Sequence, residues 1–93
     1  MISVIIPVYN DGEGLEATLK SLVSQKAEHS FEIIVADNGS TDNTQSVARH
    51  FEKQYPYLVQ LVIESDIKGS YAARNKAIRS AQGDIFCFID ADM

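Results

Sequence analysis

Several residue types are scarce in this sequence of 93 residues, and each shortage excludes a class of protein. The one cysteine, Cys87, has no second cysteine with which to form an internal disulfide. Eight lysines and arginines stand against 13 aspartates and glutamates, which gives a net charge of −5 without any basic run. Nucleic acids and anionic membrane surfaces attract positively charged proteins, so we expect neither as the main partner.

Long apolar runs are also missing. A helix that crosses a membrane needs roughly 20 apolar residues, and no stretch of the chain approaches that length. The N-terminal sequence MISVIIPVYN has no basic flank of the kind that begins a secretory signal. We therefore expect a cytoplasmic chain with no membrane span, at most peripheral to a membrane if it is part of a longer protein.

The sequence does contain a regular alternation of short apolar runs and helical patterns. The apolar runs are typical of strands buried in a parallel sheet and lie at Ile2–Val8, Phe31–Ala36, Leu58–Ile63 and Ile85–Ile89. Apolar or alanine residues at helical spacing lie between these runs, the last of them from Gly69 to Ala81. Cys87 lies within the fourth run, so we expect a small buried side chain there.

The segments between these elements predict where two of the helices begin or end. Ser40 or Thr41 is expected to cap the second helix at its N-terminus, with Asp42 in its first turn. Gly83 is expected to follow the third helix as its C-terminal glycine.

Strands that alternate with helices form parallel sheets joined by right-handed crossovers. The predicted fold is therefore α/β, with three layers and a sheet of order 3-2-1-4, like one half of a Rossmann-like doubly wound fold. Residues 1–93 are expected to form one such domain. Ligands of these folds bind beyond the carboxyl ends of the strands, where the winding reverses, which here lies between the first and fourth strands.

Polar residues that are far apart in the sequence gather at that edge of the predicted sheet. The strand ends and the third helix bring together Tyr9, Asn10, Asp11, Asp37, Arg74, Asp90 and Asp92. Asp90 and Asp92, separated by one residue, are able to bind one divalent cation together. Because Mg²⁺ is usually held by one or two carboxylates and by substrate phosphates, a metal-bridged diphosphate fits this pair. The alternative is that the two aspartates belong to a solvated turn. The pair by itself does not distinguish this turn from a metal site.

Three other residues have both a structural and a functional interpretation. Asp37, followed by NGSTD, forms an Asx-turn or a helix cap, or else it accepts from a base N–H or a ribose hydroxyl. Pro7 removes an N–H from a central strand, which marks either a strand end or a rigid backbone ledge for a ligand. Arg74 pairs either with Asp90 or Asp92, or with a nucleotide.

Five motifs together resemble a known family. SVIIPVYN, EIIVADNGSTDNT, GSYAARN, AQGD and FIDAD occur in the order seen in family 2 glycosyltransferases, which have the nucleotide-sugar-binding GT-A fold. The resemblance covers nearly the whole chain. It implies the donor-binding part of an inverting enzyme that transfers a sugar from a nucleotide diphosphate, with UDP favoured, to an acceptor hydroxyl.

The resemblance also implies roles for single residues. Those expected to contact the donor are Pro7, Val8, Tyr9, Asn10, Asp37, Arg74, Asp90, Ala91 and Asp92. Asp37 would contact the base, and Arg74 would lie near the base or the diphosphate. Asp90 and Asp92 match the family's Asp-x-Asp motif, which handles the ribose and the Mn²⁺ or Mg²⁺ on the diphosphate, with Asp92 as the first choice for a direct metal ligand.

The chain departs from the family pattern in two residues and in length. Ala77 stands where glycine is frequent, and Met93 stands where an acidic residue is frequent, which slightly weakens the metal site. In the family, the acceptor-binding part and the general base follow the Asp-x-Asp motif. We therefore expect no acceptor part and no catalytic base in this chain, and no turnover by the chain alone, although its parent would be an enzyme.

Two other functions are compatible with an α/β domain of this size. A dinucleotide-binding oxidoreductase domain would use Asp37 as its ribose-binding acid, but the loop YNDGEG lacks G-x-G-x-x-G, and Asp11 and Glu13 would repel a pyrophosphate. A non-catalytic, self-associating module is the other alternative. The fourth strand is apolar on both faces and has nothing after it to cover it, so we expect an open sheet edge and a homo-oligomer formed through this strand.

Overall fold

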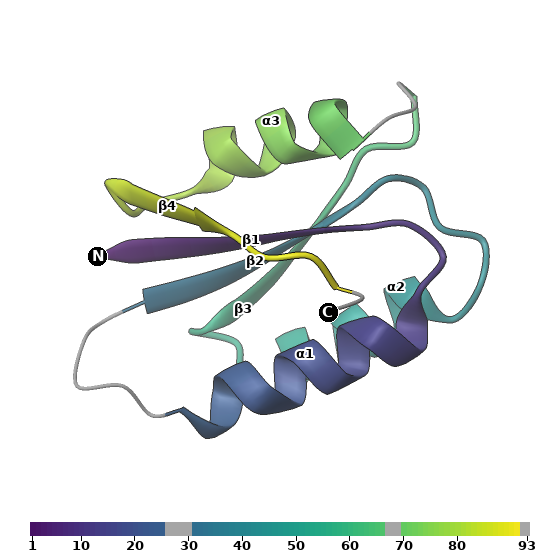
Figure 1. The fold of residues 1–93 in the computed structure, drawn as a ribbon, viewed down its shortest axis with the longest axis horizontal. Coiled ribbons are helices and arrows are strands. Elements are labelled where there is room, and N and C mark those ends of the chain that lie inside the picture. The colour runs from purple at the N-terminus through teal and green to yellow at the C-terminus, as the bar shows by residue number, and fades with distance from the viewer. Residues whose placement is uncertain (26–30, 67–69, 92–93) are drawn as a thin grey trace.

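The structure, a computed structural model, describes residues 1–25, 31–66 and 70–91. Strands and helices alternate along the chain, as Figure 1 shows: β1 (Ile2–Val8), α1 (Gly12–Ser24), β2 (Phe31–Asp37), α2 (Thr44–Gln54), β3 (Val59–Ile63), α3 (Ser70–Ser80) and β4 (Ile85–Phe88). The predicted strands and helices are therefore all present, with ends that differ by a few residues. Within the described ranges, no helix combines the length and apolar character that crossing a membrane requires.

The four strands form one parallel sheet of order β3-β2-β1-β4, as the alternation predicted. β1 lies in the middle, and its Val4 is in register with Ile33 of β2 on one side and with Cys87 of β4 on the other. The chain first winds outward to β3 and then returns past β1 to β4. The winding therefore reverses between β1 and β4, at the place expected from the sequence.

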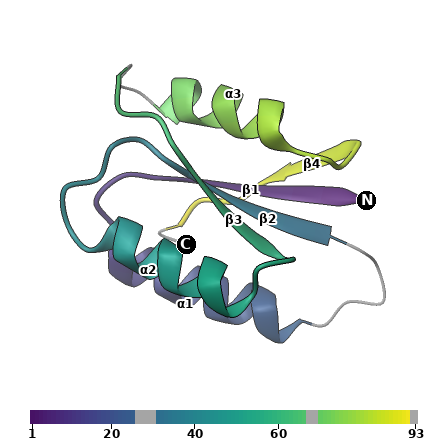
Figure 2. The ribbon, with the colours of Figure 1, turned by 180° about the vertical axis from the view of Figure 1, so that it is seen from behind.

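Helices cover both faces of the sheet. Figure 2 shows α1 and α2 together on one face and α3 alone on the other. The face under α1 and α2 carries the larger apolar cluster, in which Leu15 and Leu19 of α1 are fully buried. On the opposite face, Ala73 and Ala77 of α3 are fully buried against the sheet. These small side chains allow α3 to lie close to the strands, as its alanine-rich pattern indicated.

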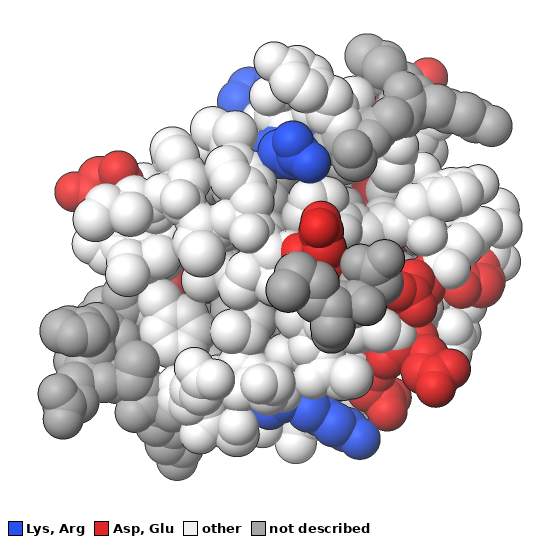
Figure 3. All heavy atoms as spheres, in the orientation of Figure 1, with Lys and Arg blue, Asp and Glu red and all other residues white. Residues whose placement is uncertain are grey.

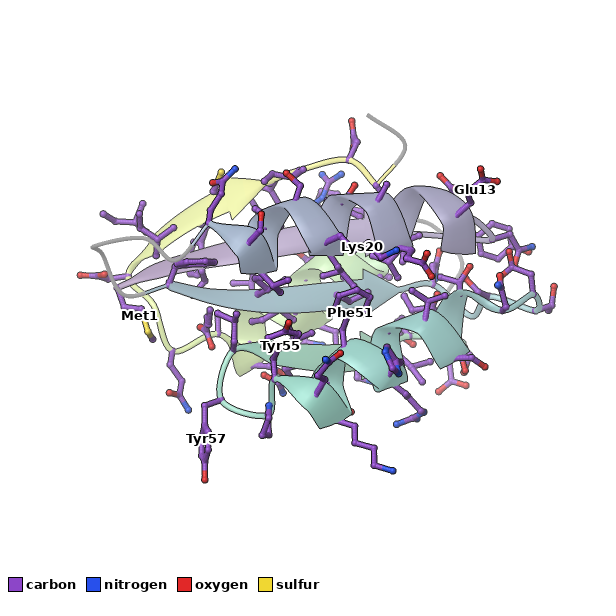
Figure 4. All side chains as sticks on the ribbon, turned by 90° about the horizontal axis from the view of Figure 1, so that it is seen from below. Met1, Glu13, Lys20, Phe51, Tyr55 and Tyr57 are labelled. Carbon is purple, nitrogen blue, oxygen red and sulfur yellow. The ribbon has the colours of Figure 1, made fainter. Side chains whose placement is uncertain are left out.

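α2 is amphipathic, and its Phe51 packs inward beside Tyr55, the residue at its C-cap. Phe51 is 5% exposed, and its ring stacks on that of Tyr55 at a centroid distance of 6.3 Å. Figure 4 shows these two side chains near the sheet, while Tyr57, after the helix, points away from the molecule. The helix ends at Gln54, before Pro56, as a proline in that position requires.

β4 differs from the other strands because all four of its residues are exposed. It is the edge strand beyond β1, and Phe86 and Phe88 are 42% and 47% exposed. The prediction of an open apolar edge is confirmed. The prediction that Cys87 is buried is wrong: its side chain is exposed, because a residue on an uncovered edge strand lacks the neighbours that an apolar run alone suggests.

The predicted helix ends were wrong in two places. α2 begins at Thr44 with Asn43 at its N-cap, so neither Ser40 nor Thr41 caps it and Asp42 precedes it. α3 ends at Ser80, too early for Gly83 to be its C-terminal glycine, and Gly83 does not have a positive φ. Instead of capping helices, Ser40 and Gly83 form hydrogen bonds with residues that are far away in the sequence.

Candidate functional site

The loop after β1 is bonded to the loop after β2. Asn10 has a φ of 50°, a left-handed conformation that asparagine tolerates better than most residues. Its Oδ1 accepts the backbone N–H of Thr41 at 2.8 Å and that of Asp42 at 3.3 Å. The N–H of Asn10 donates to Ser40 Oγ at 2.9 Å. These bonds hold the two loops side by side at the carboxyl edge of the sheet.

Thr44 extends this connection to the start of α1. Its Oγ1 accepts the N–H of Asp11 at 2.9 Å, and Asp11 caps α1 by accepting the N–H of Gly14 at 3.0 Å. The Thr44 hydroxyl and its N–H both donate to the Asp42 carboxylate, the N–H at 2.9 Å. The hydrogen bonds from Thr44 lower the pKa of Asp42 below its ordinary value of 3.8, because they favour the charged form.

Asp37, at the end of β2, is fully buried. Its carboxylate accepts four hydrogen bonds: from the N–H groups of Gly39 (3.1 Å) and Ser40 (2.9 Å), from the Ser40 hydroxyl, and from Gln45 Nε2 at 2.8 Å. Gly39 has a φ of +78°, which turns the chain back toward the carboxylate. Asp37 therefore organises the loop between β2 and α2.

The segment after β4 is held by α1. Ala91 is 4% exposed and belongs to the core cluster under α1 and α2. Its carbonyl oxygen accepts the hydroxyl of Thr18 at 3.0 Å. Asp90 precedes this anchored residue and is exposed, beside a groove that α1 and the end of β4 line. The chain thus presents the Asp90 carboxylate to solvent from a fixed position.

Arg74 lies on α3, beside β4. Its guanidinium lies over the ring of Phe88, with Cζ 5.3 Å from the ring centroid, which is within the range of a cation–π contact. It makes no ion pair with Asp90, and among the described residues its buried Nε has no hydrogen-bond partner. The structural interpretation, an ion pair between Arg74 and Asp90, is therefore wrong. Its other predicted partner, Asp92, lies outside the described residues.

The predicted site residues divide by exposure. Pro7 and Val8 are buried within β1, while Tyr9 (56% exposed) and Asn10 reach the surface after it. Asp37 and Ala91 are buried, and Asp90 is exposed. The hydrogen bonds join Asn10 to the loop that Asp37 organises. Ala91 is instead bonded to Thr18 of α1, and Arg74 lies over the ring of Phe88 on β4.

The sequence interpretation missed the hydroxyl and amide groups that hold these loops. They belong to Thr18, Thr44 and Gln45, and to Ser40, which was predicted to cap a helix instead. For Thr18, a signal was present: Gly14 and Thr18 are four residues apart and share a helix face. Thr44 and Gln45 gave no such signal, because a hydroxyl or amide at the start of a helix does not reveal which nearby loop group it will bond.

Acidic side chains outnumber basic ones around this edge. Figure 3 shows red side chains gathered on one side of the molecule and few blue ones beside them. A pocket at the start of α1 is lined by Asp11, Glu13, Glu16 and Asp42, together with Gly12 and Asn43. Within residues 1–25, 31–66 and 70–91, however, no three acidic, histidine or cysteine side chains are grouped closely enough to hold a metal ion.

One exposed carboxylate at the reversal of the winding is compatible with a divalent cation of the Mg²⁺ or Mn²⁺ type. Such ions prefer oxygen ligands and take one or two carboxylates together with phosphate oxygens of a substrate. Asp90 offers one of these carboxylates. The chemistry of the residues present therefore fits a metal that a bound diphosphate completes.

Comparison with known proteins gives one consistent family. The family model for glycosyl transferase family 2 matches residues 3–93. Glycosyltransferase AglE from Haloferax volcanii is 45% identical over 92 residues, a match that covers 98% of this chain and 30% of AglE.

Two solved structures share the fold over the whole sheet. Mannosyltransferase PcManGT from Pyrobaculum calidifontis, in complex with GDP-Man and Mn²⁺, has a TM-score of 0.86 and 34% identity; the match covers 98% of this chain and 27% of that protein. Glucosyl-3-phosphoglycerate synthase from Mycobacterium tuberculosis, in complex with Mn²⁺, UDP and glucosyl-3-phosphoglycerate, has a TM-score of 0.79 and 26% identity, over 98% of this chain and 33% of the synthase. The present chain spans a third or less of each relative.

Proposed function

This chain belongs to glycosyl transferase family 2, and we propose that residues 1–93 form the donor-binding part of a metal-dependent, inverting enzyme. It would bind a nucleotide-diphospho-sugar, with UDP favoured as the nucleotide, and the parent protein would transfer the sugar to an acceptor hydroxyl. The fold is that of GT-A glycosyltransferases, two of which have been solved with a nucleotide and Mn²⁺ bound.

The observation that carries the proposal is the position of Asp90. It lies directly beyond β4 at the reversal of the winding, its carboxylate is exposed, and the following Ala91 is anchored in the core. Ligands of open α/β sheets bind at this position. A carboxylate presented there suits the metal on a diphosphate.

The resemblance to the family supports the other donor contacts. We propose that the donor is contacted by Pro7, Val8, Tyr9, Asn10, Asp37, Arg74, Asp90, Ala91 and Asp92. Because the Asp37 carboxylate is fully occupied, a base that reaches it would replace the Gln45 amide, the one donor that comes from a helix. Arg74 is suited to the diphosphate, since its guanidinium is always charged and is not paired with a described carboxylate.

Each group at the site would act on the leaving nucleotide. Asp90, with Asp92, would hold the cation, which when bound neutralises charge that develops on the leaving diphosphate. Arg74 would stabilise the same charge from the side of α3. Proton removal from an acceptor hydroxyl requires a base positioned near the sugar. We propose that this base belongs to another part of the parent protein, so the chain alone binds the donor but does not turn it over.

Titration calorimetry tests donor binding. We expect UDP to bind more tightly with Mn²⁺ or Mg²⁺ present than without, and GDP provides the comparison of bases. Asp90→Asn should lose part of the gain from metal, since Asp92 would remain as the other carboxylate of the pair. Asp84→Asn is the control, because Asp84 is an exposed carboxylate at the opposite end of β4, where its partner is the N-terminal ammonium at 3.2 Å. If neither nucleotide binds in a metal-dependent way, the proposed function is wrong.

We also propose that the chain self-associates through β4, because the two edges of the sheet are protected differently. On β3, the outward Leu61 N–H donates to Glu52 Oε2 at 2.9 Å, and Lys76 Nζ donates to the Ile63 carbonyl at 2.7 Å. On β4, Ile89 N–H bonds to β1, so the alternation of a parallel ladder directs the backbone of Phe86 and Phe88 outward. An apolar edge with outward backbone groups favours pairing with a second copy.

Light scattering over a range of concentrations tests this association. The chain should be larger than a monomer, and Phe86→Lys should shift it to monomer because a lysine on an edge strand opposes pairing. Tyr57→Lys, at a fully exposed aromatic residue away from the edge, should not. A monodisperse monomer for the unaltered chain would exclude the association.

A further inference from the structure

The contact between Thr18 and Ala91 connects two parts of the chain that are 73 residues apart. Thr18 is in the middle of α1, where a threonine hydroxyl ordinarily donates to the carbonyl one turn earlier in its own helix. Here the hydroxyl donates instead to Ala91 O at 3.0 Å. The helix therefore uses this side chain to hold the segment after β4.

Gly14 allows the same close approach from the preceding turn. A Cβ at this position would lie 2.6 Å from the Ala91 carbonyl oxygen and 2.4 Å from Asp11 Oδ2, and the first of these is a backbone atom that does not move freely. Glycine lowers helix stability by about 1 kcal/mol relative to alanine. Two close approaches, one by the Asp11 carboxylate and one by the Ala91 carbonyl, explain its presence inside α1.

These contacts fix the peptide that follows Asp90. The Ala91 methyl is buried in the core, and its carbonyl is bonded to Thr18, so the backbone is held from both sides. Asp90 is exposed while the next residue, Ala91, is buried, so the two side chains lie on opposite sides of this segment. Holding Ala91 in the core therefore keeps Asp90 at the surface, and less conformational freedom remains for Asp90 to lose when it binds a ligand.

We propose that Thr18 is a positioning residue for Asp90, acting through the Ala91 carbonyl, and that Gly14 is required for the same contact. This inference rests on the proposed function, since it assigns to α1 the task of orienting the carboxylate that binds the metal on the donor. Thr18 touches neither the metal nor the nucleotide.

Thr18→Val and Thr18→Ser test the role of the hydroxyl. Valine keeps the shape of the side chain but cannot donate, whereas serine can. With UDP as the probe, the gain in affinity from Mn²⁺ should fall about fivefold in Thr18→Val, the size of one neutral hydrogen bond. Thr18→Ser should restore most of it. The affinity for UDP without metal should remain as in the unaltered chain, which a general loss of structure would not allow.

Gly14→Ala applies the second test. Alanine favours a helix interior, but its Cβ would also crowd the Asp11 carboxylate that caps α1, so the unfolding free energy of this variant is measured beside its affinity. We expect Gly14→Ala to reduce the Mn²⁺-dependent gain at least as much as Thr18→Val, because its Cβ displaces the Ala91 carbonyl.

Amide hydrogen exchange gives a readout that needs no ligand. The Ile89 N–H donates to Ile5 O at 3.0 Å, next to the anchored segment, so its exchange reports local opening there. Exchange at Ile89 should be faster in Thr18→Val and nearly unchanged in Thr18→Ser.

The outcomes separate this inference from the proposed function. If the unaltered chain shows no metal-dependent binding, the proposed function fails, and unchanged exchange at Ile89 in Thr18→Val would overturn the anchoring as well. If the unaltered chain binds UDP with Mn²⁺, an undiminished gain in Thr18→Val overturns the positioning role. An equal loss with and without metal also overturns it, because it would show a purely structural effect.

Discussion

Asn10 and Thr41 are joined by a hydrogen bond of 2.8 Å between a side-chain oxygen and a backbone N–H, although 31 residues separate them. The bond links the loops that follow two neighbouring strands of the sheet. Asn10 also has a left-handed backbone. A substitution at residue 10 is therefore expected to affect stability in two ways, through the backbone conformation and through the lost side-chain hydrogen bonds.

The first prediction separates these two contributions at Asn10. Asn10→Gly keeps the backbone conformation and loses the hydrogen bonds from Thr41 and Asp42, which should lower the unfolding free energy by about 1–2 kcal/mol. Asn10→Ala also brings an unfavourable left-handed backbone and should cost roughly 1 kcal/mol more. Urea unfolding followed by circular dichroism measures both. Equal stability of the two variants would contradict the backbone contribution.

The second prediction concerns acid. The pKa of Asp42 is lowered by the hydrogen bonds from Thr44, so the bonded carboxylate stabilises the folded state above the ordinary value of 3.8 and loses this effect as pH falls through its folded-state pKa. Asp42→Asn should therefore be less stable than the unaltered chain at neutral pH, and the difference should disappear in acid. Unfolding curves over a pH series check this, and a difference that persists unchanged at low pH would contradict it.

Much of the fold follows from the sequence because its determinants are local. The apolar runs predicted four strands, and the alternation with helices predicted the sheet order that is observed. The alanine row of α3 predicted its close packing, with Ala73 and Ala77 fully buried. Strand order in particular depends on crossover handedness, which is nearly invariant.

The helix ends and the loop contacts were harder to predict because their partners are remote. Ser40 has the chemistry of a helix cap, but its hydroxyl donates to Asp37 and its Oγ accepts from Asn10. Gly83 has the chemistry of a helix C-terminus, but its N–H donates to Ser3 Oγ, 80 residues away. A local pattern indicates what a residue is able to do, and the tertiary contacts decide which of these possibilities is used.

Gly83 gives the third prediction. A Cβ there would lie 2.3 Å from Ser3 Oγ and 2.8 Å from the Met1 carbonyl oxygen, so Gly83→Ala should lower the unfolding free energy by about 1–3 kcal/mol. Removing the hydroxyl with a second change, Ser3→Ala, should recover only part of the loss, because the backbone contacts remain. Full recovery in the double variant, measured by urea unfolding, would contradict this explanation.

The fourth prediction concerns the protected edge of the sheet. Glu52 Oε2 accepts the Leu61 N–H, so Glu52→Ala should expose this group on β3 and speed its hydrogen exchange. Glu52→Gln keeps an acceptor oxygen and should protect Leu61 nearly as well. The exposed edge of Glu52→Ala should also increase aggregation with concentration. Equal exchange at Leu61 in the two variants would show that Glu52 does not protect the strand.

The last prediction ranks three changes around Asp37. Gln45→Ala removes one of four donors to its carboxylate and should cost about 0.5–1.5 kcal/mol of unfolding free energy. Asp37→Asn should cost more, because the charge is lost, yet its amide oxygen can still accept from the Gly39 and Ser40 N–H groups. Asp37→Ala should cost most, on the order of 3–5 kcal/mol, because it leaves buried donors without an acceptor. Urea unfolding gives the order. If Asp37→Ala were no less stable than Gln45→Ala, the carboxylate would not organise this loop.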